Sequence, residues 1–293
     1  MKHYIIVTIA AFAALNMSCS KNMENPSAGI TTITATLANH NLKTVLGEDG
    51  ESVLWSPKDE ISVFYNEDGI KFTSINTQPK ASTIFTSDSP IIYGGSEGTE
   101  GTLLYGLYPY NESNAQVGDK LTFSVPSSQT AVAGSFARGS FPSAGRSTDT
   151  NIAFYNVCGG VRFSLSQRGI WIIKFSGNNG EAIAGKARIR FDASGHPVVD
   201  EVLQGETSVT LSVPEGKEFL PGQWYYISLL PTALTKGFTI QFIKNEDDIF
   251  SANISVPVEI KRTTFGSLRN IDNNTIPSLV IEDLSEIPEQ WSE

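Results

Sequence analysis

The sequence predicts an all-β protein, with two tandem β-sandwich domains that follow a signal peptide. Three observations lead to this prediction. Apolar and polar residues alternate in short runs from about residue 30 onward, clusters of Gly, Pro, Asn, Asp and Ser separate these runs, and no long window beyond the N-terminus has the period of a helix. About fifteen such runs follow one another, which is typical of sandwiches built from short strands.

The N-terminus has the pattern of a bacterial lipoprotein signal. Met1–His3 is basic, Tyr4–Leu15 is almost wholly apolar, and the small residue Ser18 precedes Cys19. The apolar run is too short to cross a bilayer as a helix, which takes about 20 residues, and it matches the central part of a secretory signal. We therefore predict that residues 1–18 are removed and that acyl chains on Cys19 hold the protein to a membrane outside the cytoplasm. An ordinary cleaved signal is the alternative.

The rest of the chain divides into four predicted parts. Residues 19–29 form a linker, residues 30–150 an N-terminal sandwich, residues 151–275 a C-terminal sandwich, and residues 276–293 an appendage with an apolar start and an acidic end. The boundary at residue 150 is placed after Pro126–Asp149. This stretch is weakly patterned and longer than most loops inside a compact domain, so we interpret it as an excursion between the domains.

The first strand-like run is Thr31–Ala38. Its apolar residues Ile33, Ala35 and Leu37 fall on one face, and threonines fall on the other. This period of two, in a run rich in β-branched residues, predicts a half-buried strand. Two later runs are separated by Glu67-Asp68-Gly69, which predicts a tight hairpin turn.

Charge and cysteine content narrow the function. The chain has 21 basic and 31 acidic residues and a net charge of −10, which argues against a nucleic-acid partner because such proteins need a basic surface. The two cysteines are Cys19 and Cys158. If Cys19 is lipidated, Cys158 has no partner within the chain. It lies in an apolar run, so we predict a buried core residue.

No enzyme, metal or cofactor is predicted. Gly94–Gly98 matches G-x-S-x-G around Ser96, but that motif acts on a strand-to-helix turn, and here it lies between strand-like runs. His40 and His196 lie in predicted turns, no Cys or His pair has ligand spacing, and no acidic cluster fits a calcium loop. A structural or adhesive protein is favoured. A surface lipoprotein that binds glycans or host proteins without polymerising, and a secreted hydrolase that uses either histidine, are the alternatives.

A family resemblance begins at Val53–Asn66. Here Trp55 stands on a short strand, a turn with an acidic residue follows, and an apolar strand comes next. This arrangement resembles the fimbrillin-like family, the type V pilin subunits of Gram-negative anaerobes. Further stretches follow in the family's order through the rest of the chain: Leu103–Asn111, Leu121–Ala137, Asn156–Leu165, Tyr225–Leu234 and Ile260–Ile271.

The resemblance implies a fold, a route of export and a mode of assembly. It implies two Greek-key, transthyretin-like sandwiches in a precursor that is lipidated and carried to the outer membrane. A protease then removes the first strand after a basic residue, and a strand of another subunit fills the groove. Such pairing is β-augmentation. Repeated head to tail, it produces a fimbria, because the contact does not close on itself. The implied partners are other fimbrial subunits and outer-membrane lipid, with a host protein or glycan as a further possibility.

The resemblance assigns roles to particular segments. The removable strand would be defined by Ile33, Ala35 and Leu37, and the donor strand by Leu279 and Ile281. Lys43 is the candidate processing site, because the family often has Arg or Lys before Thr at this place. No Arg precedes Arg138, so a strictly Arg-specific protease could not act here. That departure favours an anchor or accessory subunit. The alternative is that both segments are ordinary strands of a monomeric lipoprotein.

Overall fold

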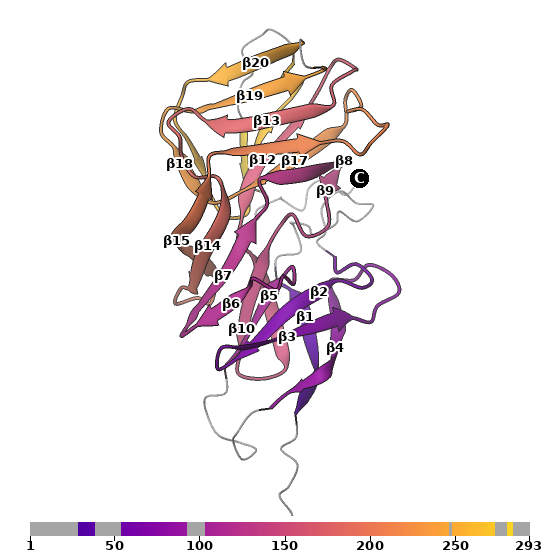
Figure 1. Ribbon diagram of the computed structural model, residues 1–293, viewed down its shortest axis with the longest axis vertical. Coiled ribbons are helices and arrows are strands. Elements are labelled where there is room, and N and C mark those ends of the chain that lie inside the picture. Colours follow the sequence, from indigo (N-terminus) through magenta and orange to yellow (C-terminus); the bar gives the residue numbers. More distant parts are fainter. Residues whose placement is uncertain (1–28, 39–53, 93–102, 246–247, 273–279, 284–293) are drawn as a thin grey trace, which may run out of the picture.

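The computed structural model describes residues 29–38, 54–92, 103–245, 248–272 and 280–283. Within these residues the chain forms 23 β-strands and no helix, so the all-β prediction is confirmed. In particular, this part of the chain has no helix with the length and apolar character needed to cross a membrane. The molecule is elongated, with the early strands at one end and most of the later strands at the other (Figure 1).

The early strands form a closed barrel. Its order is β1 (Ile30–Leu37), β11 (Asn151–Asn156), β10 (Ser143–Ser147), β5 (Leu104–Tyr108), β2 (Glu60–Tyr65), β3 (Asp68–Ser74) and β4 (Ser82–Ile91). The barrel closes through β1, which pairs antiparallel with β4 and parallel with β11. Closure leaves no unpaired edge in this sheet, and the first strand completes the ring.

The predicted hairpin is present, but its turn lies one residue earlier than expected. Tyr65 pairs with Asp68, so the loop consists of Asn66 and Glu67 rather than Glu67-Asp68-Gly69. Both loop residues have positive φ, 49° and 72°. This is the geometry of a type I′ turn, which matches the twist of the flanking strands and which Asn adopts readily. Asp68 and Gly69 therefore belong to β3.

The later strands form the other sheets. One sheet has the order β17 (Trp224–Leu229), β12 (Gly159–Ser164), β22 (Thr264–Leu268) and β23 (Val280–Asp283). A six-stranded sheet has the order β20 (Ile249–Ile254), β19 (Phe238–Ile243), β13 (Ile172–Gly177), β16 (Ser208–Ser212), β8 (Ser128–Val132) and β9 (Ser135–Phe136). The remaining sheets are β15 (Pro197–Glu206), β14 (Ala184–Phe191), β7 (Lys120–Val125) and β6 (Ala115–Val117), and the pair β18 (Thr232–Leu234) with β21 (Val258–Ile260).

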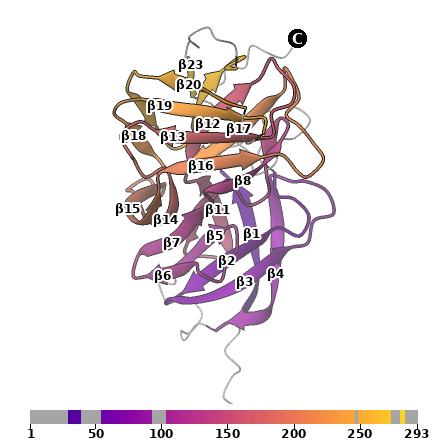
Figure 2. The ribbon, with the colours of Figure 1, turned by 45° about the horizontal axis from the view of Figure 1, so that its top comes forward.

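Strands from both sides of residue 150 share sheets. β11 belongs to the barrel, whereas β7 pairs with β14 and β8 pairs in parallel with β16 (Figure 2). Pro126–Asp149, which we expected to be a loop, contains β8, β9 and β10. β8 pairs with the nearby β9 and with the distant β16, and β10 pairs with the nearby β11 and with β5. The many small residues of this stretch weaken the apolar alternation that would have predicted these strands. The division into domains at residue 150 stays a prediction.

Cys158 is fully buried, as predicted, and burial raises the pKa of its thiol to about 12. The thiol is therefore protonated and unreactive at neutral pH. The glycines that follow it are required by close packing. A side-chain carbon at Gly159 would collide with the carbonyl oxygen of Lys261, and one at Gly160 would collide with that of Ile227. The "CGG" sequence thus lets β12 lie tightly against its neighbours.

Candidate functional site

The first strand, β1, lies between β4 and β11 and pairs with both. Its apolar residues Ile33, Ala35 and Leu37 are 1%, 0% and 2% exposed, so the alternation in the sequence places them in the core. Backbone hydrogen bonds extend along the strand to both neighbours. The Thr34 amide donates to the Thr150 carbonyl at 2.8 Å, and the Leu37 amide donates to the Ala81 carbonyl at 2.9 Å. Both sides of β1 are therefore satisfied by the barrel.

Trp55 is the buried side chain that contacts the backbone of β1. Its indole Nε1 donates a hydrogen bond to the Ala35 carbonyl oxygen at 3.0 Å, and the side chain is fully buried. The ring makes edge-to-face contacts with Phe85, Tyr108 and Phe154, with centroids 5.0, 5.4 and 5.2 Å away. Such aromatic pairs add stabilisation beyond the area that they bury. Trp55 thus ties the first strand to three other strands of the barrel.

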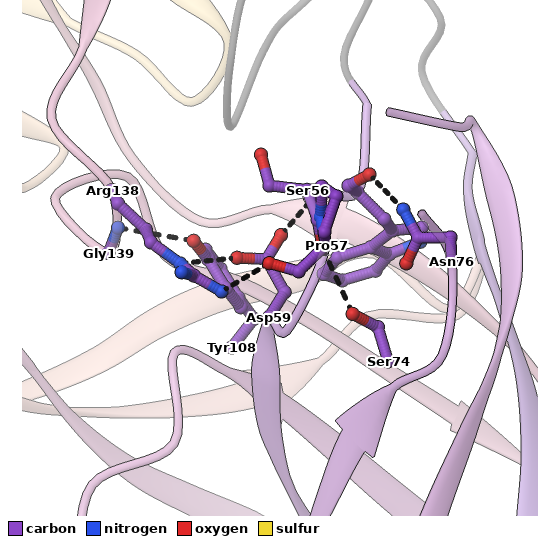
Figure 3. Close-up of polar contacts among 9 residues, drawn as sticks. Ser56, Pro57, Asp59, Ser74, Asn76, Tyr108, Arg138 and Gly139 are labelled. Atoms are coloured by element: carbon purple, nitrogen blue, oxygen red, sulfur yellow. Dashed lines mark hydrogen bonds and ion pairs between the residues drawn. The ribbon is translucent and has the colours of Figure 1, made fainter. Parts of the chain in front are cut away.

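The turn after Trp55 is held by a buried carboxylate, as Figure 3 shows. The Ser56 amide donates to Asp59 Oδ2 at 2.7 Å, and Arg138 Nε donates to Asp59 Oδ1 at 2.8 Å. Arg138 Nη2 also donates to the Pro57 carbonyl at 3.1 Å. Asp59 is buried and Arg138 is half-exposed, so the ion pair closes the turn from its solvent side. These two residues lie 79 positions apart in the sequence.

Further hydrogen bonds attach the same turn to neighbouring segments. The Asn76 amide nitrogen donates to the Trp55 carbonyl at 2.8 Å, and the Ser74 hydroxyl donates to the Ser56 carbonyl at 3.0 Å (Figure 3). The Gly139 amide donates to the Tyr108 hydroxyl at 3.1 Å. The backbone around Trp55 is therefore fixed at several points, which orients the indole toward β1.

Burial raises the pKa of the Asp59 carboxyl, an effect that the Ser56 amide and Arg138 partly offset. The folded protein thus binds this proton more tightly than the unfolded chain does. The resulting stabilisation is fully present below the unfolded pKa and is lost as pH rises through the raised one. We expect the free energy of unfolding of the wild type, minus that of Asp59→Asn, to fall as pH rises from below the unfolded pKa of this carboxyl through its raised pKa in the folded protein. Urea denaturation of both proteins across this range measures it. A difference that grows with pH would mean that the Arg138 pair outweighs burial.

Three predicted site residues lie outside the described part of the chain: Cys19, Lys43 and Leu279. Ser96 and His40, for which no catalytic role was predicted, also lie outside it. Ile281 lies in β23, where its backbone pairs antiparallel with Gly266 at the edge of a sheet. The assigned roles in lipidation, processing and strand donation all stay predictions. The Asp59–Arg138 pair was not predicted, because nothing in the local sequence links two residues so far apart.

Elsewhere in the described part of the chain, few side chains are arranged as a catalytic or binding site would need. His196 lies on a turn, with its ring 4.7 Å from that of Tyr155 and its Nδ1 3.8 Å from a carboxylate oxygen of Asp192. Among the described residues, no three His, Cys, Asp or Glu side chains are grouped so that they could hold a metal ion. Trp224 is half-buried, and the guanidinium groups of Arg162 and Arg269 lie over its ring, 4.7 and 5.2 Å from the ring centroid.

No protein-family model matches the sequence, and no curated protein matches it. Solved structures do match. A candidate cell adhesion protein from Bacteroides uniformis ATCC 8492 has a TM-score of 0.54 and 14% identity, covering 88% of this chain and 99% of that one. Another from Bacteroides ovatus ATCC 8483 has a TM-score of 0.50 and 10% identity, covering 87% and 98%. The chain has the fold of these two proteins.

A more distant match is the tip fimbrial protein Mfa3 from Porphyromonas gingivalis with a C-terminal truncation. It has a TM-score of 0.40 and 7% identity, covering 86% of this chain and 98% of that one. At 14% and 10% identity, the match to the two Bacteroides proteins shows a shared fold.

Proposed function

We propose that the protein is a structural or adhesive subunit of a surface fimbria, exported as a lipoprotein and assembled by strand exchange. The observation that carries this proposal is the place of β1 in the barrel, between β4 and β11. A short first strand without charged side chains completes a closed barrel and buries Ile33, Ala35 and Leu37. The fold shared with candidate cell adhesion proteins supports the same role.

Loss of β1 would create a groove ready to accept another strand. The edges of β4 and β11 would expose their backbone donors and acceptors, and Trp55, Phe85 and Phe154 would lose part of their cover. A donor strand with the same alternation restores both the hydrogen bonds and the apolar contacts. The proposed donor is the segment that contains Leu279 and Ile281, from a second subunit.

The position of Lys43 supports its role as the processing site. Residues 39–53 join the end of β1 to the Trp55 segment, and Lys43 is the one Lys or Arg among them. A cut there separates β1 from the rest of the chain without breaking any of the strands that the structure describes. The acylated Cys19 lies on the same side of the cut as β1, so cleavage would also release the subunit from the outer membrane. Uncut, the subunit would remain anchored by lipid.

Strand exchange predicts a protease-dependent change of size. The protein with Cys19→Ala, which removes the lipidation site, is treated with a trypsin-like protease and analysed by intact mass and by electrophoresis in SDS without heating. We expect a cut after Lys43 followed by SDS-resistant multimers. Lys43→Ala should block the cut and the multimers, whereas Ile281→Asp should allow the cut but reduce the multimers.

The opposite outcome is equally clear. A protein cut at Lys43 that keeps β1 bound and stays monomeric would reject strand exchange. Persistent monomers with an intact N-terminus would instead favour the surface lipoprotein that binds glycans or host proteins without polymerising. Binding to a glycan array would then test that function.

A further inference from the structure

The edge strand β20 lies at the end of the molecule opposite the barrel (Figure 1). It pairs with β19 in unbroken register from Ile249 to Ile254, and no strand of the described residues pairs with its other side. Its sequence, IFSANI, contains no charge and no proline. These are the properties that proteins usually avoid in an edge strand, because such an edge readily pairs with another chain.

The other described sheet edges are protected. β15 carries Asp200 and Glu201 and has two register shifts against β14. β17 is covered by Gln129, whose side chain exchanges hydrogen bonds with the Ser228 backbone at 2.8 and 3.0 Å. β23 contains Glu282 and Asp283, and the other edge strands, β6, β9, β18 and β21, have at most three residues each. Among the described strands, β20 alone is long, regular and uncharged at a free edge.

Several apolar side chains on and beside β20 remain partly or largely exposed. Phe250 stacks on Phe242 with centroids 4.9 Å apart, and Ala252 lies on the same face, yet both remain only partly buried at the edge. Beside them Ile249 and Val256 are 51% and 57% exposed. A strand added to β20 would cover this apolar rim.

We propose that β20 is the interface for a second copy of this chain, paired antiparallel about a two-fold axis through Ala252. The reason is that β20 is self-complementary in this register. Phe250 lies opposite Ile254 of the second copy, which joins the two inner faces. On the outer face, Ser251 lies opposite Asn253 of the second copy. Paired residues of an antiparallel ladder share a face, so these pairs match apolar with apolar and polar with polar, whereas Ile249 at the start of the strand lies opposite Ser255. It joins two six-stranded sheets into one and is independent of the proposed strand exchange at β1.

Charge exchange on the outer face tests this interface in the full chain with Cys19→Ala. The double variant Ser251→Lys/Asn253→Lys puts like charges opposite one another across the axis, and Ser251→Glu/Asn253→Glu does the same with the opposite sign. In sedimentation equilibrium we expect the wild type to dimerise, each variant to dimerise at least about tenfold more weakly, and a mixture of the two to recover dimers. Val202→Lys on the β15 edge is the matched control and should leave dimerisation unchanged.

Three outcomes would overturn the proposal. The wild type could remain monomeric at high concentration, or the charged variants could dimerise as well as the wild type while their thermal unfolding shows that they are folded. A monomer that dimerises only after deletion of residues 284–293 would instead assign the β20 edge to the chain's own C-terminal segment.

Discussion

Trp55→Ala is expected to lower the free energy of unfolding by about 3–5 kcal/mol, the usual cost of truncating a large aromatic in a core. The substitution leaves a cavity among Phe85, Tyr108 and Phe154 and removes the donor to the Ala35 carbonyl. It should also destabilise the pairing of β1 in particular, because the indole donates a hydrogen bond to the backbone of that strand. Urea denaturation measures the first effect, and amide hydrogen exchange at residues 30–37 measures the second.

Trp55→Phe separates the two contributions. The ring still fills much of the space, but the Ala35 carbonyl loses its partner, so we expect a cost of about 1–3 kcal/mol. Trp171→Ala, at an exposed tryptophan, is the matched control and should change stability little. If Trp55→Ala left the hydrogen-exchange rates of β1 unchanged, the claim that Trp55 stabilises β1 in the barrel would be wrong.

Ile33→Asp is expected to cost more than about 4 kcal/mol, because it replaces a core side chain with a charge that has no partner. Ile33 is buried and lies opposite Phe85 on β4. The strand would be expelled from the barrel, and the protein would either unfold or expose the β4 and β11 edges. Thermal unfolding and binding of a hydrophobic dye distinguish these two results.

Thr32→Asp is the control for that substitution. It places the same carboxylate one residue earlier, on the exposed face of the same strand, so we expect a change within about 0.5 kcal/mol. Equal losses of stability in the two variants would mean that the binding of β1 to the barrel does not depend on its buried face.

The parts of the fold that were predictable are those with a local signal. Alternation placed Ile33, Ala35 and Leu37 in the core, and the apolar run around Cys158 predicted its burial. The hairpin after β2 was predicted, but its turn lies one residue earlier than expected, because Asn66 and Glu67 adopt positive φ and form the loop in place of Glu67-Asp68-Gly69.

The parts that were missed depend on distant partners. The parallel pairing of β1 with β11 joins residues more than a hundred positions apart, and no local pattern encodes such a choice. The same is true of the Asp59–Arg138 pair at the candidate site. In Pro126–Asp149, small residues weakened the apolar alternation although β8 to β10 form there.

The interleaving of β7 and β8 with the later sheets has a mechanical consequence. The chain leaves the barrel after β5, enters the sheets of β14 and β16, and returns to the barrel through β10 and β11. Tension applied between the barrel and the far end would therefore load ladders of backbone hydrogen bonds and not one flexible joint. The two ends of the molecule should yield together under force, as a single element of a fibre would need to do.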